Sequence, residues 1–176
     1  MIPAPAVGPR VVLVGPMGAG KTTVGRLVAE QLGVAFADTD VLVEEAAGRT
    51  VSDLFVEEGE AHFRRLERAT VEAALAEHRG VLSLGGGAVL DPATQADLAP
   101  HLVVFLRVGL TDAVKRVGLG TGRPLLLGNV RARVKQLLDE RAPVYEGVAR
   151  VVVDTDDRTP AEVAAEVLTA VTGGER

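Results

Sequence analysis

VVLVGPMGAGKTTVGRLVAEQL, residues 11–32, is the stretch that decides the fold. Residues 10–14 form a short, β-branched apolar run, which predicts a buried strand. Residues 15–22, GPMGAGKT, match the pattern GxxxxGK[ST] at every fixed position. Residues 21–32 carry apolar side chains at helical spacing, and Gly33 is a plausible end for that helix. A strand, a glycine-rich loop and a helix in this order are the context in which the pattern binds phosphate.

The residue types of this loop match the chemistry of a triphosphate. Glycines let backbone N–H groups turn inward around phosphate oxygens, and the helix N-terminus adds the positive end of its dipole. Lys21 would reach the β- and γ-phosphates, and the Thr22 hydroxyl would bind Mg²⁺. We predict a nucleotide site made of Gly18, Ala19, Gly20, Lys21, Thr22 and Thr23. The alternative is a glycine-rich turn with an accidental lysine, although the chain has only three lysines and one lies here.

The same motif occurs in several classes of nucleotide-binding protein. A GTPase switch would also carry an N-K-x-D motif and a D-x-x-G motif, and neither occurs in this sequence. A small-molecule kinase needs a second substrate site instead, and the rest of the chain predicts one.

Composition narrows the kind of partner and the number of domains. The 176 residues fit one domain, with a core over about residues 10–172 and a flexible leader at residues 1–9. A formal net charge of −5 disfavours nucleic acid as the main partner, but it allows a small anionic substrate where arginines gather. The absence of cysteine excludes disulfides, thiolate metal sites and cysteine nucleophiles, and it suits a cytoplasmic protein. No stretch approaches the roughly 20 apolar residues of a membrane span.

Short apolar segments alternate with helical segments along the rest of the chain. Apolar runs predict four further strands, at residues 34–37, 81–84, 101–106 and 150–153. Periodic segments predict helices from residue 50 to about 78 with an interruption at Gly59, from Asp91, and at residues 111–117, 130–141 and 159–171. Strands that are apolar on both faces and alternate with helices predict an α/β domain with a parallel sheet covered on both sides.

Polar residues that suit a second substrate follow the predicted strands. Asp38 and Asp40 could serve Mg²⁺ and an attacking hydroxyl, although an N-cap aspartate with a solvated neighbour is the alternative. Arg64 and Glu67 share a helix face, where a surface ion pair is the simpler interpretation. Residues 85–87, GGG, could let a ligand approach the backbone closely, or could form only a flexible turn.

Two arginines lie in and after a glycine-rich loop. Residues 118–128 hold four glycines and a proline, so we predict a mobile lid that carries Arg123 to the phosphates. Arg141 ends the following predicted helix, where it could simply complement the helix dipole. The three histidines show no metal-ligand spacing and are interpreted as surface or packing residues.

In their order along the chain, these motifs resemble those of the shikimate kinase family. The set is GxxGxGKT at 15–22, DTD at 38–40, GExxFRxxE at 59–67, GGGA at 85–88, RP at 123–124 and RxPxY at 141–145. The resemblance runs from about Val11 to Val171, nearly the whole chain, and only the first motif is widely shared. Thr22 stands where the family often has serine and keeps the hydroxyl, whereas the lid core at 118–129 is somewhat divergent.

The resemblance implies a fold and a reaction. The fold would be a five-stranded parallel sheet in the order 2-3-1-4-5, as in nucleoside monophosphate kinases. The reaction would transfer the γ-phosphoryl group of ATP, with Mg²⁺, to the 3-hydroxyl of shikimate, a step of chorismate and aromatic amino acid biosynthesis. The expected partners are ATP and shikimate, without nucleic acid or membrane, and a cytoplasmic monomer is expected.

The resemblance also implies roles for individual residues. Asp40 would hold the ring hydroxyls and could act as the base, while Asp38 and Thr22 would support Mg²⁺. The catalytic residues would be Lys21, Asp40 and Arg123. Adenine would be flanked by Arg116, Arg158 and Pro160. The shikimate site, within about residues 38–68 and beyond, would comprise Asp40, Phe55, Phe63, Arg64, Gly85, Gly86, Gly87 and Arg141.

The residue types agree with this assignment, because shikimate is a small monoanion with several hydroxyls. Two arginines and an aspartate suit it, since arginine grips a carboxylate with two hydrogen bonds. One alternative is a related kinase that acts on gluconate or a nucleotide, which would lack the pairing of Arg64 with Arg141. The other is a non-catalytic ATP-binding module, against which the intact set of predicted catalytic residues argues.

Overall fold

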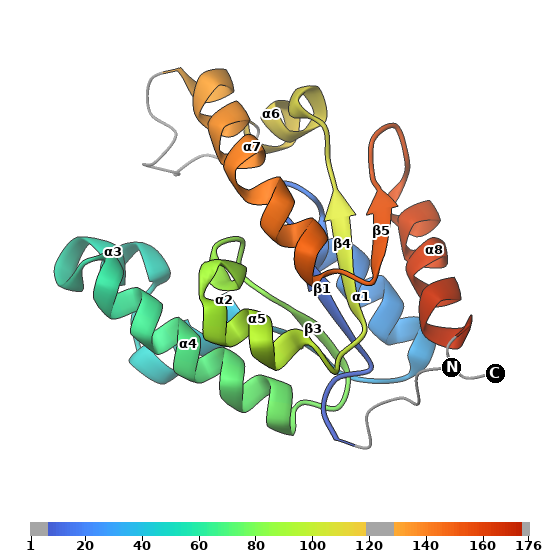
Figure 1. Cartoon of the computed structure of the whole chain (residues 1–176), viewed down its shortest axis with the longest axis horizontal. Helices are drawn as coiled ribbons and strands as arrows, with labels where there is room; N and C mark the ends of the chain where they lie inside the picture. The colour runs from blue at the N-terminus through green and yellow to red at the C-terminus, as the bar shows by residue number, and fades with distance from the viewer. Residues whose placement is uncertain (1–6, 119–128, 174–176) are drawn as a thin grey trace.

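The computed structural model describes residues 7–118 and 129–173, and Figure 1 shows a central sheet with helices around it. The strands are β1 (Val11–Val14), β2 (Phe36–Asp38), β3 (Val81–Ser83), β4 (Val103–Arg107) and β5 (Val151–Asp154). The helices are α1 (Lys21–Leu32), α2 (Thr39–Ala47), α3 (Val51–Glu58), α4 (Glu60–Glu77), the 3-10 turn η1 (Ala88–Leu90), α5 (Pro92–Leu98), α6 (Leu110–Gly118), α7 (Val130–Val148) and α8 (Pro160–Gly173). Within the described ranges, no helix is both long and apolar enough to cross a bilayer.

The five strands are parallel and lie in the order β2-β3-β1-β4-β5. β1 is the central strand, where Leu13 pairs with Ser83 of β3 and Val104 of β4. Each of the four β1 residues is at most 1% exposed. A parallel sheet covered on both faces requires apolar residues at every position of its central strand, which explains the run VVLV. The predicted fold class and strand order are confirmed.

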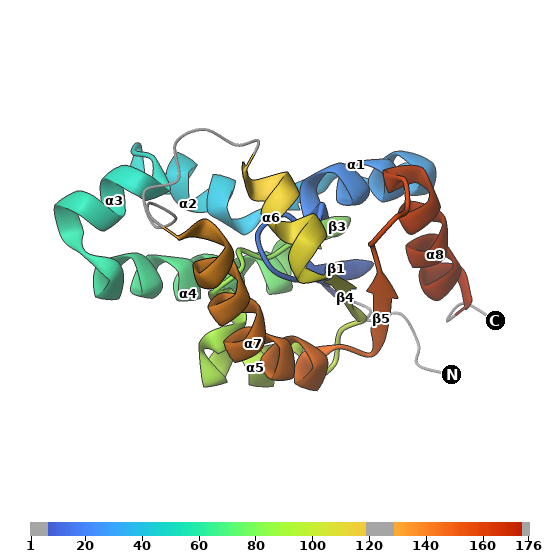
Figure 2. The same cartoon turned by 90° about the horizontal axis from the view of Figure 1, so that it is seen from above.

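Two groups of helices cover the two faces of the sheet, as Figure 2 shows from above. α1 and α8 pack on the face that includes Val11 and Leu13. α4, α5 and the C-terminal half of α7 pack on the face that includes Val12 and Val14. Because successive strand side chains point to opposite faces, β1 contributes to both cores and is held firmly in place. The segments that leave β1, β2 and β3 therefore begin at one fixed edge of the sheet.

A third core lies beyond this edge and belongs to α2, α3 and α4. Its buried residues are Val43, Leu54 and Phe63. The Thr50 hydroxyl accepts a hydrogen bond from the Asp53 N–H at 3.0 Å and so caps the start of α3. Gly59, at a φ of 85°, separates α3 from α4. The predicted cap and the predicted interruption at Gly59 are both confirmed, and together they set the direction in which α4 begins.

α7 is longer than the sequence predicted. The helix expected to end at residue 141 continues through Pro143 to Val148. Proline removes one backbone hydrogen bond, to the carbonyl of the residue four positions earlier. That residue, Asp139, lies on the exposed side of α7, where water can take the place of the missing donor. The last turns are stabilised by packing, because Tyr145 is buried in the core on this face of the sheet.

Other boundaries also differ from prediction. β2 begins at Phe36 and β4 at Val103, each two residues later than the apolar runs indicated. α2 was not predicted, because only Thr39 and Val43 among its residues are buried and so leave little apolar periodicity. In contrast, α1 has the predicted bounds, and Asp91 caps α5 ahead of Pro92 as expected.

Gly80→Ala tests how tightly β3 enters the sheet. A Cβ on Gly80 would lie 1.9 Å from the Ala35 carbonyl oxygen, which is itself fixed by the Val81 N–H at 2.9 Å. We expect this change to lower the free energy of unfolding by about 1–3 kcal/mol or more. Gly147→Ala is the control, since nothing lies within 4 Å of its added Cβ and alanine favours the helix. Urea unfolding followed by circular dichroism measures both, and equal midpoints would contradict the expectation.

Candidate active site

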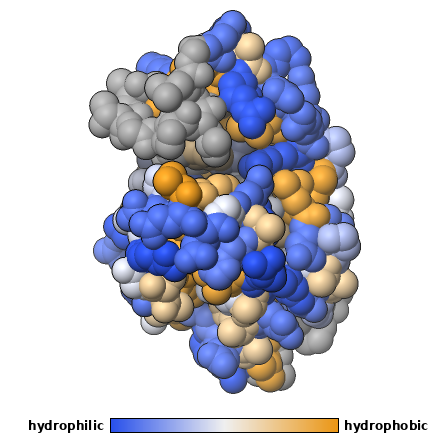
Figure 3. Space-filling model, turned by 90° about the vertical axis from the view of Figure 1, so that its left-hand side faces the viewer, coloured by the Kyte–Doolittle hydropathy of each residue, from blue (hydrophilic) through white to orange (hydrophobic). Residues whose placement is uncertain are grey.

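A cleft of about 620 Å³ opens at the carboxyl ends of β1, β2 and β3. Its walls come from the phosphate-binding loop (residues 15–22), from α3 and α4, and from α7. Figure 3 views the molecule from the side toward which α3 projects in Figure 1, where hydrophilic residues dominate the surface. Ligands of open α/β sheets gather at this edge, so the cleft has the expected location for a site.

The phosphate-binding loop connects β1 to α1 at the base of the cleft. The Lys21 ammonium donates hydrogen bonds to the carbonyl oxygens of Gly15 and Pro16, at 2.6 and 3.0 Å. α1 begins after Gly20, and no side-chain hydrogen bond caps this end of the helix among the described residues. The first N–H groups of α1 therefore lie at the cleft, where an anion would complete their hydrogen bonding.

Two aspartates lie together where β2 gives way to α2. Asp38 Oδ1 accepts a hydrogen bond from the Asp40 backbone N–H at 2.8 Å and so caps α2. Burial, followed by the Asp38 and Glu67 carboxylates, raises the pKa of Asp40 to about 6, while Lys21 and Arg64 oppose the rise. A carboxylate with a proton affinity this close to neutral pH suits acid–base chemistry in a cleft.

The glycine loop (residues 85–87) brings bare backbone against charged side chains. A Cβ on Gly85 would lie 2.5 Å from Asp40 Oδ1. A Cβ on Gly87 would lie 2.6 Å from both terminal nitrogens of Arg64. The absence of a side chain at both positions makes these approaches possible without a shift of Asp40 or Arg64. The GGG sequence therefore allows two charged side chains of the protein to lie against the loop, whereas the predicted approach of a ligand stays a prediction.

Arg64 is held by partners on α3 and α4. Its Nη1 donates a hydrogen bond to Glu67 Oε1 at 2.8 Å, and the Glu67 side chain is only 5% exposed. The guanidinium lies 5.3 Å from the Phe63 ring centroid and 6.0 Å from that of Phe55. Burial raises the pKa of Glu67, although the bonded Arg64 opposes the rise. Arg64 and Glu67 do form the expected ion pair, but it lines the cleft with a buried Glu67 and a half-buried Arg64 and so differs from a pair on the open surface.

α7 supplies the opposite wall of the cleft. Arg133, Leu137 and Arg141 line it from one face of the helix, since residues four apart share a face. A Cβ on Gly86 would lie 3.5 Å from Arg141 Nη1, so this arginine reaches the middle of the glycine loop. Arg64 and Arg141 thus approach adjacent glycines from two different helices, and a small anion beside the loop would meet both.

Most of the site residues predicted from sequence are brought together in this cleft. Its lining includes Gly18, Gly20, Lys21, Thr22, Thr23, Asp38, Asp40, Phe55, Phe63, Arg64, Gly85, Gly86, Gly87 and Arg141. It also includes residues that were not predicted for the site, namely Met17, Val51, Glu60, Glu67, Leu84, Arg133 and Leu137. Arg133 did carry a signal, because it lies two turns before Arg141 on the same face of a predicted helix.

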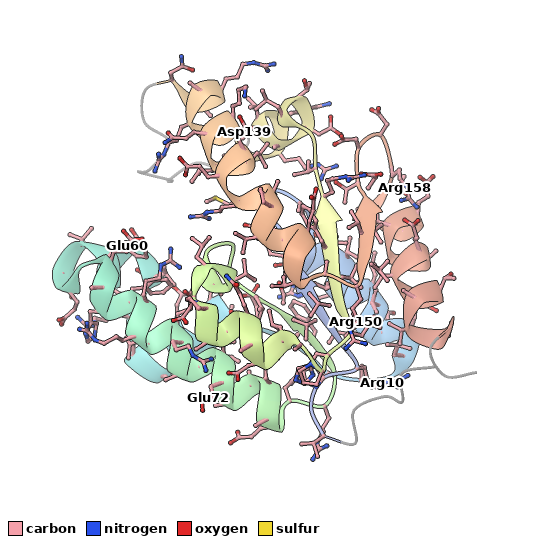
Figure 4. The ribbon with its side chains drawn as sticks, viewed as in Figure 1. Arg10, Glu60, Glu72, Asp139, Arg150 and Arg158 are labelled. Carbon is pink, nitrogen blue, oxygen red and sulfur yellow. The ribbon has the colours of Figure 1, made fainter. Side chains whose placement is uncertain are left out.

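The arginines predicted to flank adenine lie outside the cleft. Arg116 of α6 donates from Nη1 to the Gly18 carbonyl oxygen at 3.0 Å and to the Thr155 hydroxyl at 3.1 Å, so it adjoins the phosphate-binding loop. Arg158 donates to the Glu166 carboxylate of α8 at 2.7 Å. Figure 4 labels Arg158 beside β5 and α8, on the far side of that view from α3.

Three other predicted residues do not line the cleft. Ala19, a residue of the phosphate-binding loop, is 1% exposed because it packs into the core that includes Val11 and Leu13. Pro160 is the first residue of α8. Arg123, with the predicted lid at 118–128 apart from Gly118 at the end of α6, lies outside the described residues. The roles assigned to these residues stay predictions.

Thr22 and Asp38 offer oxygen ligands that fit a magnesium ion. Mg²⁺ prefers hard oxygen ligands, keeps several waters and is usually held by one or two protein groups together with substrate phosphates. Both side chains line the cleft beside the phosphate-binding loop. Alongside burial, the Asp38 carboxylate raises the pKa of Asp40, so a cation placed here would relieve negative charge. In the described ranges, no group of three or more His, Asp or Glu side chains is placed to hold a metal ion.

The fold and the cleft together define a class of enzyme. A phosphate-binding loop at the carboxyl edge of a 2-3-1-4-5 sheet shares one cleft with arginines and an aspartate that suit a hydroxylated anion. That combination defines a P-loop phosphotransferase acting on a small molecule. The family model described as shikimate kinase matches residues 17–172, which is most of the chain. The chain belongs to the shikimate kinase family.

Individual relatives agree with this membership. Shikimate kinases of Thermobifida fusca and Salinispora arenicola are 60% and 59% identical to it, over 89% and 92% of this chain and 91% and 96% of their own. The structure of shikimate kinase from Acinetobacter baumannii in complex with shikimate has a TM-score of 0.89 and 33% identity, over 97% of this chain and 96% of that one. A gluconokinase from Sinorhizobium meliloti 1021, at a TM-score of 0.57 and 18% identity over 93% of this chain and 91% of that one, shares the fold alone. The predicted resemblance is confirmed.

Asp40→Asn tests the electrostatic strain of the site. Because the pKa of Asp40 is raised from 3.8 to about 6 on folding, its contribution to stability is lost as the pH rises through that interval. We expect Asp40→Asn to increase the free energy of unfolding by about 1–3 kcal/mol above pH 6 and to change it little near pH 4. Thermal unfolding between pH 4 and pH 8 measures this gain. The exposed control Asp53→Asn should show no gain in the free energy of unfolding. If the Asp40→Asn protein were less stable than wild type at pH 7, the charge of Asp40 would not be destabilising.

Proposed function

We propose that this chain transfers the γ-phosphoryl group of ATP to the 3-hydroxyl of shikimate, giving shikimate 3-phosphate and ADP. The observation that carries the proposal is that one continuous cleft contains both the phosphate-binding loop and the side chains of Asp40, Arg64 and Arg141. Membership of the shikimate kinase family supports the same reaction. The reaction is a step of chorismate and aromatic amino acid biosynthesis.

The acceptor half of the cleft matches a small monoanion that carries hydroxyl groups. Arg64 and Arg141 would hold the shikimate carboxylate, since a guanidinium can donate two parallel hydrogen bonds to it. Asp40 would accept hydrogen bonds from the ring hydroxyls beside Gly85. Phe55 and Phe63, whose ring centroids lie 4.7 Å apart, would wall the apolar face of the ring.

Phosphoryl transfer requires mainly positioning and the stabilisation of charge. Lys21 would exchange the loop carbonyls that it now contacts for the phosphates of ATP. Asp40, with a pKa of about 6, would accept the proton of the attacking hydroxyl. When bound, Mg²⁺ would neutralise phosphate charge, with Thr22 and Asp38 as its protein ligands.

On the nucleotide side, residues 18–23 would hold the phosphates through the loop and the start of α1. Arg116 adjoins this loop through Gly18, and it would flank adenine after exchanging its present partners. Arg158 and Pro160 would flank adenine from the segment between β5 and α8. Arg123 would supply a further cation to the phosphates.

We also propose that the enzyme acts as a cytoplasmic monomer. One chain supplies both halves of the cleft, so a second copy is not needed to complete the site. Sedimentation at micromolar concentration would test the monomer, and cell fractionation would test the location.

An ATP-turnover assay with different acceptors tests the function. ADP should form with shikimate and much less with gluconate, with nucleoside monophosphates or without an acceptor. Lys21→Ala should abolish turnover and keep the fold, because the lysine supplies charge to the phosphates whereas the glycines shape the loop. Turnover with another acceptor would replace the proposed substrate, and ATP binding without any turnover would indicate a non-catalytic module.

Arg64→Met and Arg141→Met test the carboxylate site. Removing either arginine should weaken shikimate binding by about 2–5 kcal/mol, the range for unpairing a buried charge, and should affect ATP binding much less. Arg65→Met is a matched control, because Arg65 follows Arg64 on α4 but is exposed and does not line the cleft. Isothermal titration calorimetry with each ligand measures the losses, and equal losses for shikimate and ATP would mean that the two arginines are structural.

A further inference from the structure

We propose that the hydroxyl groups of Thr39 and Tyr145 are positioning groups that clamp the glycine loop (residues 85–87) in its acceptor-binding conformation. The proposal rests on the proposed function, because the loop lies in the acceptor half of the cleft. Neither residue is among those that line the cleft, and the transfer chemistry needs neither hydroxyl. Their effect on the reaction would act through the loop backbone.

Thr39 fixes the first residue of the loop. Its hydroxyl oxygen accepts a hydrogen bond from the Gly85 backbone N–H at 3.0 Å. Thr39 is 0% exposed, so water does not compete for this bond. Thr39 stands between Asp38 and Asp40 in the chain, and the bond therefore ties the turn that carries both aspartates to the loop that Asp40 contacts.

Tyr145 fixes the second residue of the loop from the other side. Its hydroxyl donates a hydrogen bond to the Gly86 carbonyl oxygen at 2.5 Å. Its ring is 1% exposed and packs on Phe105 of β4, with centroids 5.1 Å apart. Burial raises the pKa of Tyr145, although the neighbouring Arg141 and Arg64 oppose the rise, so the hydroxyl keeps its proton and remains a donor. Tyr145 follows Arg141 by one helical turn of α7, so the hydroxyl and the guanidinium reach Gly86 from the same helix face.

The composition of the loop makes such a clamp necessary. A Cβ on Gly85 or Gly87 would lie within 2.6 Å of the end of the Asp40 or Arg64 side chain, which would have to move, so glycine lets both side chains lie against the loop. Glycine loses more backbone freedom on ordering than any other residue, so three in succession make this loop costly to order. Two hydrogen bonds from buried, well-packed residues order the loop in advance, which lowers the entropic cost of binding.

Ser83 provides a matched control for the loss of a buried hydroxyl. It ends β3 just before the loop and is 0% exposed. Its hydroxyl has no hydrogen-bond partner among the described residues. Ser83→Ala therefore removes a buried hydroxyl next to the loop without releasing the loop.

The test compares Thr39→Val, Tyr145→Phe and Ser83→Ala in steady-state kinetics and in amide hydrogen exchange. In the first two variants we expect the KM for shikimate to rise roughly five- to thirty-fold, the factor for losing one hydrogen bond with a buried partner left behind. The KM for ATP and kcat should change little, because the loop contributes equally to the bound and transition states. Thr39→Ser, which keeps the hydroxyl, should restore the KM. Exchange at residues 85–87 of the ligand-free protein should quicken in Thr39→Val and Tyr145→Phe and stay unchanged in Ser83→Ala.

An unchanged KM for shikimate in Tyr145→Phe, or equal rises in KM for both substrates, would overturn the proposal. So would a loss of thermal stability with unchanged exchange in the loop, because the hydroxyls would then only stabilise the fold. Wild-type protein without shikimate-dependent turnover would overturn the proposed function instead. In that case the exchange rates of the free protein would still decide whether the two hydroxyls clamp the loop.

Discussion

The close contact between charged side chains and the bare backbone of the glycine loop is the constraint on which the rest of the acceptor site depends. The ends of the Asp40 and Arg64 side chains lie within 2.6 Å of where Cβ atoms on Gly85 and Gly87 would be, so glycine leaves both side chains free to take these positions. Glycines alone would leave the loop loose, and the hydrogen bonds with Thr39 and Tyr145 add to the order that the following 3-10 turn gives it. Side chains that lie this close to the loop backbone lose part of their contact with water. Arg64 is compensated for this loss by its hydrogen bond to Glu67. The loop, its supports and the charges around it are thus linked by these close contacts.

The crowding of charged side chains around the glycine loop is also electrostatically unfavourable. Three carboxylates, those of Asp38, Asp40 and Glu67, lie near one another, and burial raises the pKa of two of them. Lys21 and Arg64 offset part of this repulsion. Such strain is typical of active sites, where residues are selected for the reaction and the surrounding fold supplies the stability. The apolar strand β1 and the two cores on the sheet supply it here.

Local signals explain what the sequence could predict. The bounds of α1, the cap at Thr50 and the break at Gly59 follow from residues within one turn of each boundary. The continuation of α7 past Pro143 could not be predicted, because it depends on the distant contacts of Tyr145 with β4 and the glycine loop. The same limit applies to the site. Its charged and glycine residues stand in recognisable motifs, whereas apolar lining residues such as Leu137 are identified only by how the helices cross.

The separate core of α2, α3 and α4 has a consequence for how this fold diversifies. Val43, Leu54 and Phe63 pack with one another and not with the clusters on the sheet, so the acceptor wall has a packing unit of its own. Substitutions there can reshape the pocket for the acceptor while the sheet continues to hold the nucleotide loop unchanged. The wall that carries Phe55, Phe63 and Arg64 can therefore vary as a unit, while the glycine loop and Arg141 stay tied to the sheet and to α7.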